Sequence, residues 1–140
     1  MRKIEKLCVL LHLFIGVGAL AGGAAAIVNP HDPMGMSAGE ALQYSPFTSF
    51  LIPGLFLFCV IGLGNLFAAL AFFRHWRLSA FVSGFFAFAL AFWIAIQCAM
   101  LQAVVALHVI FFCLGVVQGF LAIRLLFMAY NRDEVGLAEE

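Results

Sequence analysis

Charged residues are scarce in this chain of 140 residues: only 10% are Asp, Glu, Lys or Arg, whereas 66% are hydrophobic. A soluble domain of this length has about a quarter charged residues and about half apolar ones. This chain therefore has too little polar surface to cover a globule in water, and a lipid bilayer removes that requirement. The formal net charge is zero, so the composition gives no electrostatic case for binding nucleic acid.

Three further scarcities narrow the function classes. All four prolines lie in residues 29–54, so the rest of the chain lacks the strongest helix breaker. The four cysteines form no C-x-x-C pair, which leaves a zinc knuckle or a thioredoxin-like redox pair unsupported. No Asp, Glu, Lys or Arg lies well inside an apolar run. Proton-coupled small transporters usually need an embedded ionisable group, so this lack counts against the small four-span multidrug exporters, which rely on a glutamate.

What the chain does have is four long apolar runs. A helix needs about 20 apolar residues to cross about 30 Å of hydrocarbon. Four segments meet this requirement, at 7–28, 51–73, 78–100 and 103–127. The first also resembles a signal peptide with a cleavage site at Ala19-Leu20-Ala21, but its apolar run continues to Val28, which is too long for a signal-peptide core. We therefore expect one all-α membrane domain over residues 1–140.

The basic residues predict how these spans are oriented. They precede the first span, separate the second from the third, and follow or end the fourth: Arg2, Lys3, Lys6, Arg74, Arg77, Arg124 and Arg132. With four spans, these places all lie on one side of the membrane, and the positive-inside rule makes that side cytoplasmic. We expect both termini in the cytoplasm, an outer loop at 29–50, and a cytoplasmic tail at 128–140.

Short connections and small residues predict how the spans pack. The second connection, Arg74–Arg77, is only four residues long, and short connections force neighbouring helices to run antiparallel. Ridges of small residues favour close approach of helices in lipid. They comprise Gly18, Gly22 and Ala26; Gly64 and Ala68; Ser83, Ala87, Ala91, Ala95 and Ala99; and Gly115 and Gly119. The expected fold is an antiparallel, up-down-up-down four-helix transmembrane bundle.

Uncharged polar residues inside the spans are the candidate site. Asn65 and Gln118 each lie about 21 Å from the outer end of a span, at 1.5 Å per residue, and could bond across the bundle. The structural interpretation is an amide pair that joins helices, and the functional one is a polar spot that orients a ligand. Gln97 and His108 complete the candidate ligand-binding set. His12 lies near the inner end of its span, too far in depth from His108 for both to bind one haem.

A metal or cofactor finds weaker support. His108 is expected one turn below the outer surface, under a loop that carries His31, Asp32 and Glu40. Two histidines and two carboxylates are suitable metal ligands, but these residues show no tight ligand spacing. We therefore expect no metal and no cofactor, and we assign no catalytic residue.

The outer loop is expected to form an ordered cap. Pro30 and Pro33 end the first span, and Ser37-Ala38-Gly39-Glu40 fits a capping box that starts a short helix at 38–44. Pro53 fits the first turn of the second span. The pattern Pro33-Met34-Gly35-Met36, Ser45-Pro46-Phe47 and Phe50-Leu51-Ile52-Pro53-Gly54 resembles a family of small bacterial four-span membrane proteins with no assigned activity. The resemblance implies this architecture and a bacterial cell membrane. The general shape also resembles DoxX-type proteins, as an analogy of architecture alone.

Three functions follow, in order of preference. The first is a non-enzymatic module that binds a lipid or another small apolar ligand, or an accessory subunit of a membrane complex. The second is a small dimeric transporter or permeation unit lined by the four candidate polar residues. The third is a membrane enzyme that uses His108 with Asp32 or Glu40. The expected partners are the lipid bilayer and either a second copy of the chain or a larger membrane complex.

Overall fold

The computed structural model describes residues 1–138, and every regular element in this part of the chain is helical. The long helices are α1 (Lys3–Val28), α5 (Ser79–Leu101) and α6 (Ala106–Ala138), together with a continuous helix made of α3 (Leu51–Phe56), the π-helical segment η2 (Leu57–Leu63) and α4 (Gly64–Phe73). Within residues 1–138 these four are long and apolar enough to cross a membrane. The predicted four-helix bundle is confirmed.

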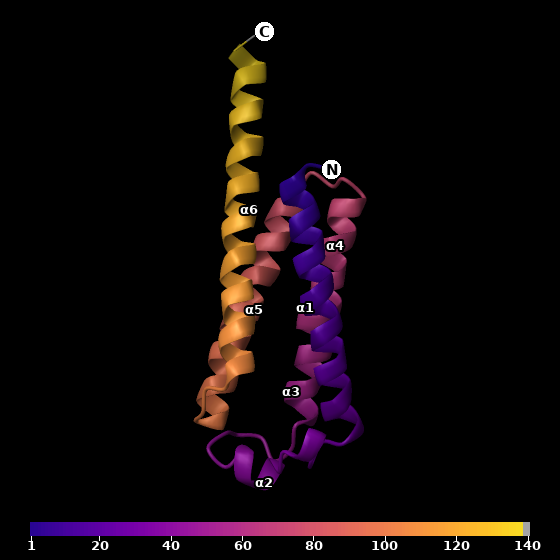
Figure 1. Cartoon of the computed structure of the whole chain (residues 1–140), viewed down its shortest axis with the longest axis vertical. Coiled ribbons are helices and arrows are strands. Elements are labelled where there is room, and N and C mark those ends of the chain that lie inside the picture. The colour runs from indigo at the N-terminus through magenta and orange to yellow at the C-terminus, as the bar shows by residue number, and fades with distance from the viewer. Residues whose placement is uncertain (139–140) are drawn as a thin grey trace.

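Two clusters of buried apolar residues show that the helices run antiparallel. One cluster contains Cys8, Phe72, Ala80 and Leu125, so the start of α1, the end of α4, the start of α5 and the later part of α6 lie together. Since the basic residues lie near these positions, we call this the basic end. The other cluster, which includes Ile15, Ile61 and Trp93, lies toward the opposite end. There the chain forms residues 29–50 and the α5–α6 connection, and we call it the loop end (Figure 1).

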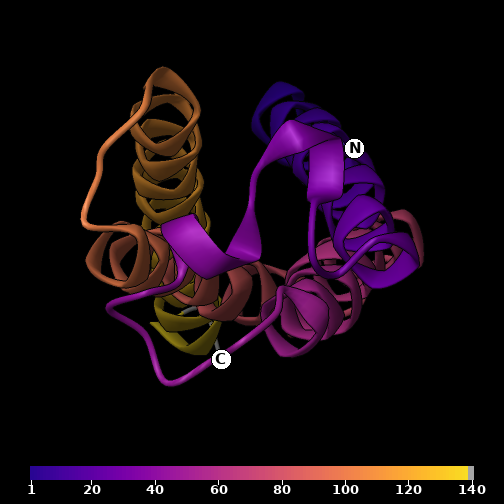
Figure 2. The ribbon, with the colours of Figure 1, turned by 90° about the horizontal axis from the view of Figure 1, so that it is seen from below.

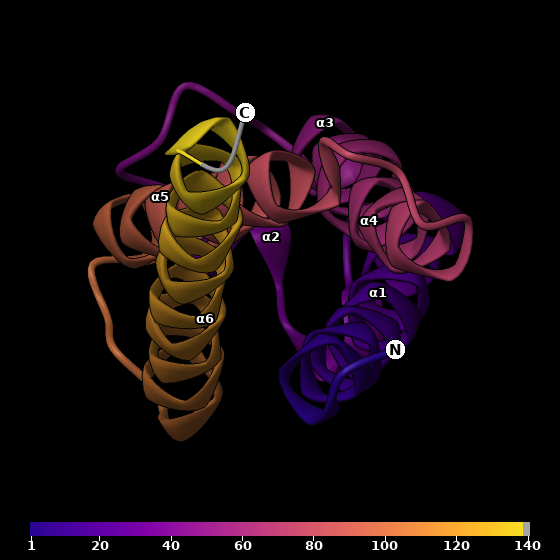
Figure 3. The same cartoon turned by 90° about the horizontal axis from the view of Figure 1, so that it is seen from above.

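The four long helices form a U shape when their ribbons are viewed along the helix axes (Figure 3). Viewed from the basic end, α4 and α5 lie side by side, and α1 and α6 extend from them in the same direction as two arms (Figure 3). Viewed from the other end, residues 29–50 lie across the space between the two arms (Figure 2). The fold is therefore a bundle in which α1 and α6 flank the α4–α5 pair, with a cap at the loop end.

Small residues allow α1 to approach α3 and η2 closely, and Ala26 of the predicted ridge is among them. A Cβ on Gly23 would lie 2.7 Å from the backbone nitrogen of Phe58, and one on Gly54 would lie 2.6 Å from the Cβ of Ala26. The predicted ridge residue Gly18 faces Phe111 of α6 instead, and Gly22 lies at ordinary contact distance from the Leu57 side chain of η2. Helix packing in lipid depends on such close approach, so this glycine contact positions α1.

The helix bounds differ from those predicted at several ends. α1 begins at Lys3, where the Glu5 carboxylate accepts a hydrogen bond from the backbone nitrogen of Arg2 at 2.8 Å and pairs with its guanidinium at 3.1 Å. α6 continues through residues 128–138, the described part of the predicted tail, and this exposed portion extends beyond the other helices (Figure 1). Residues 139–140 lie outside the described part.

The cap is present but its helix is shorter than predicted. A 3₁₀ turn, η1 (Pro33–Gly35), precedes α2 (Ala38–Ala41), which is a single turn instead of the helix predicted at 38–44. The predicted capping box is wrong, because the Ser37 side chain makes no capping hydrogen bond. Backbone bonds hold the cap instead: the Ala38 nitrogen donates to the His31 oxygen at 2.9 Å and the Phe50 nitrogen donates to the Pro30 oxygen at 2.8 Å.

Candidate functional site

A buried polar cluster joins all four long helices. It comprises His12 of α1, Asn65 of α4, Ser83 of α5 and Gln118 of α6, each with 0% of its surface exposed. His12 lies at its centre, with Nδ1 2.7 Å from Asn65 Oδ1 and Nε2 2.7 Å from Ser83 Oγ. Gln118 Nε2 lies 3.0 Å from His12 Nδ1 and 3.3 Å from Asn65 Oδ1. The predicted bond between Asn65 and Gln118 is confirmed, within a larger group.

The hydrogen-bond geometry assigns the tautomer of His12. Asn65 Nδ2 donates to the Ile61 oxygen at 2.8 Å, so its Oδ1 faces His12 as an acceptor. His12 Nδ1 must therefore carry a proton, and in the neutral ring Nε2 then accepts from the Ser83 hydroxyl. Gln118 Nε2 donates to Asn65 Oδ1, since a protonated Nδ1 cannot accept. Gln118 Oε1 is buried without a hydrogen-bond partner among residues 1–138.

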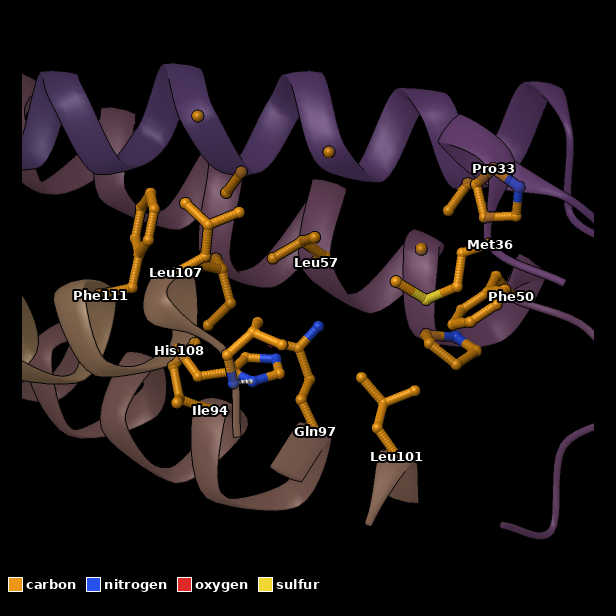
Figure 4. Close-up of a pocket in the computed structure, with 18 of the residues that line it drawn as sticks. Pro33, Met36, Phe50, Leu57, Ile94, Gln97, Leu101, Leu107, His108 and Phe111 are labelled. Atoms are coloured by element: carbon orange, nitrogen blue, oxygen red, sulfur yellow. Dashed lines mark hydrogen bonds between the residues drawn. The ribbon is translucent and has the colours of Figure 1, made fainter. Parts of the chain in front are cut away.

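An apolar cavity of about 470 Å³ lies between this cluster and the loop end. This volume falls within the range of about 300–1,000 Å³ that is typical of small-molecule sites. Ile15, Ile61 and Leu90 form its floor, and Ile15 and Ile61 lie one helical turn from His12 and Asn65. Toward the loop end, Pro33, Met36 and Phe50 lie over it (Figure 4). The cavity thus has an apolar floor directly above the polar cluster, and the cap covers its other end.

The cavity opens sideways between α1 and α6. Gly18 and Leu107 line it and are also exposed at the molecular surface. Closer to the basic end this opening is narrowed by Phe111, whose ring stacks on that of Phe14 with centroids 6.2 Å apart. A Cβ on Gly18 would lie 3.3 Å from the Phe111 ring, so the glycine leaves room beside the aromatic pair. A molecule in the surrounding apolar phase could enter at this side.

The four predicted ligand-binding residues fall into two separate groups. Asn65 and Gln118 lie in the polar cluster, beneath the cavity floor. Gln97 of α5 and His108 of α6 line the cavity, where they are the polar side chains among the lining residues. The Val105 backbone nitrogen donates to His108 Nδ1 at 3.3 Å. The structure therefore does not bring the predicted set together as one site.

The residues of the metal hypothesis are not assembled either. Within residues 1–138, no three His, Cys, Asp or Glu side chains are placed to hold one ion. His31, Asp32 and Glu40 are exposed on the cap, whereas His108 is buried in the cavity wall. No hydrogen bond within the described residues links His108 to a carboxylate, so the geometry that the enzyme hypothesis needs is also lacking there.

Sequence reasoning missed His12 and Ser83 as partners of the two amides. A signal was present, because His12 precedes Ile15 by one turn and Ser83 lies on a ridge with Ala87, but the helical phase that turns both inward could not be read from spacing alone.

Comparison of the chain with known protein families, curated proteins and solved structures finds no match. The cavity and the polar cluster are the features of the molecule that bear on its function.

Proposed function

We propose that this is a membrane protein that binds one lipid-like molecule in the cavity between α1 and α6. The observation that carries the proposal is the cavity itself: about 470 Å³, apolar, covered at the loop end and open on its side. We place the cavity in the outer half of a bacterial cell membrane, with both termini in the cytoplasm. The positions of the basic residues support this orientation.

Physical chemistry favours an apolar occupant. In a bilayer the open side of the cavity faces acyl chains, and an unfilled apolar space loses the dispersion contacts that its walls would make with an occupant. The walls carry almost no groups that could hydrate ions or solutes. A single acyl chain that enters beside Gly18 would restore the dispersion contacts of the cavity walls. The polar end of the lipid would not have to pass the apolar floor.

The same geometry gives less support to permeation. A path from the loop end to the basic end would have to pass Ile15, Ile61 and Leu90, each at most 1% exposed and packed in the apolar cluster. Beyond them His12 and its partners bond to one another. The layer of apolar residues thus separates Gln97 and His108 from Asn65 and Gln118, the other two polar residues of the predicted pathway.

The proposal is tested by counting lipids retained on the purified full-length protein. Native mass spectrometry in mild detergent should show one bound lipid on the wild type. Gly18→Leu and Gly22→Leu place a side chain in the cavity and should reduce the bound fraction at least fivefold. The matched control is Val17→Phe, which adds similar bulk on the adjacent, exposed face of α1.

Unchanged folding should accompany the loss of lipid, as measured by circular dichroism and gel filtration. A wild-type protein without bound lipid, even after incubation with total membrane lipid, would refute the proposal. So would equal lipid retention in the wild type and in both glycine variants.

A further inference from the structure

The apolar part of a lipid cannot by itself give this cavity selectivity. Lipid tails are as apolar as leucine, so a chain gains no hydrophobic free energy by moving from the bilayer into an apolar cavity. Selection between lipids must come from shape and from the few polar groups that the cavity presents. Gln97 and His108 are those groups, and their chemistry therefore indicates the ligand's head.

Helix packing places the two side chains at one level. Gly84 lies opposite Ala122 and Gly115 lies opposite Ala91, which fixes the antiparallel register of α5 against α6. In that register Gln97 is level with His108. Both side chains project from the wall that α5 and α6 form, on the cap side of Ile94 and Phe111 (Figure 4). A head bound there would lie near the membrane surface while its chain reaches toward the floor.

The hydrogen bonds of this pair leave defined groups free. His108 Nδ1 accepts from the Val105 nitrogen, so in the neutral ring Nε2 carries the proton and is a free donor. The Gln97 side chain makes no hydrogen bond to residues 1–138, so its amide has both donors and its acceptor available. Together they can donate two N–H groups to an oxygen and accept from a hydroxyl.

The charges near the cap end of the cavity disfavour an ionic head. Among the lining residues there is no Lys, Arg, Asp or Glu. The basic residues belong to the other end of the molecule, and the charges of the cap are the carboxylates of Asp32 and Glu40, both exposed outside the cavity. An anionic head would find no cation to pair with, and burying an unpaired charge is costly.

From these observations, and resting on the proposed function, we infer that the ligand is an uncharged single-chain lipid. Its head carries an oxygen acceptor, such as an ester carbonyl with a neighbouring hydroxyl, bound by His108 Nε2–H and the Gln97 amide. Each hydrogen bond contributes about 0.5–1.5 kcal/mol, which corresponds to about two- to tenfold in affinity.

The test uses probes with the same sixteen-carbon chain and different heads. Radiolabelled monopalmitoylglycerol is bound to the purified full-length protein in detergent and displaced by palmitate, hexadecyltrimethylammonium or hexadecane. We expect monopalmitoylglycerol to bind about tenfold more tightly than any of the three. Gln97→Leu and His108→Phe should each weaken it about two- to tenfold without changing the affinity for hexadecane that the competition curves give. His108→Gln keeps an N–H donor and should restore part of the affinity.

A matched control separates the head from the chain. Leu107→Ala removes apolar wall without removing a hydrogen-bonding group, so it should weaken monopalmitoylglycerol and hexadecane alike. Equal competition by hexadecane would overturn the inference and leave the proposed function intact, as would tighter binding of palmitate or of the cationic probe. Absence of saturable binding by every probe would overturn both.

Discussion

Replacing His12 by leucine tests the polar cluster most directly. The substitution removes the group that bonds Asn65 and Ser83 and lies 3.0 Å from the Gln118 amide. Side-chain hydrogen bonds between membrane helices contribute about 0.6 kcal/mol on average and about 1.7 kcal/mol at most. Loss of the two hydrogen bonds of His12 should therefore lower the free energy of unfolding by about 1–3.5 kcal/mol. The value should fall in the upper half of that range, because the Ser83 hydroxyl stays buried without its acceptor, whereas Asn65 keeps its bond from Gln118.

The measurement is reversible unfolding in mixed micelles of mild detergent and dodecyl sulfate, followed by circular dichroism. His31→Leu is the control, since it makes the same chemical change at an exposed position of the cap. The combined variant His12→Leu, Asn65→Leu, Ser83→Ala and Gln118→Leu is the decisive companion. Removing all partners leaves no polar atom orphaned, so its loss should be clearly smaller than the sum of the four single losses. A His12→Leu protein within about 0.5 kcal/mol of wild type, or strict additivity of the four losses, would refute the reasoning.

Three further predictions concern packing and orientation. Gly23→Leu should destabilise the bundle by about 1–3 kcal/mol or more, because a Cβ there meets the Phe58 backbone at 2.7 Å. Gly136→Leu is the control: it has open space around it and should cause no loss in the same unfolding assay. Leu90 is 1% exposed, so Leu90→Ala should lower the free energy of unfolding by about 2–5 kcal/mol. Phe88 is 70% exposed, so Phe88→Leu should lower it by less than about 0.5 kcal/mol. Equal losses would contradict the assigned faces of α5. In a protein freed of its natural cysteines, Glu40→Cys should react with a membrane-impermeant maleimide in intact cells and Arg77→Cys only after lysis, and the reverse result would invert the proposed orientation.

The sequence predicts the helices well because their cause is compositional. None of the four apolar runs carries a charge well inside it, so in lipid each satisfies its backbone hydrogen bonds as a helix. The positions of Arg74 and Arg77 show which helix ends lie on the same side. Depth could be predicted for the same reason: counting at 1.5 Å per residue placed Asn65 and Gln118 level, and they do bond.

Rotation about the helix axis could not be predicted in this way. A π-helical segment spans Leu57–Leu63, and because its hydrogen bonds reach one residue further, the helix beyond it turns out of the phase of a continuous α-helix. That phase decides where Asn65 points. The small residues of α1 show the same difficulty: Gly18, Gly22 and Ala26 have ideal spacing for packing, yet the tight contacts involve Ala26 and Gly23, whereas Gly18 lines the cavity. In a helix that is apolar all round, sequence spacing does not distinguish these faces.

The central position of His12 has a consequence for how the chain is made. During synthesis α1 enters the membrane first and carries a buried imidazole whose nearest partner, Asn65, is more than fifty residues away from it along the chain. Ser83 arrives next, and Gln118 joins only when the last span has been inserted. Until then the Asn65 amide oxygen and the His12 imidazole can bond to each other, but the Gln118 amide has not yet joined them. Before α6 arrives, His12, Asn65 and Ser83 can bond to one another but lack the cover that α6 gives them, so burial of the polar cluster is completed only by the last span.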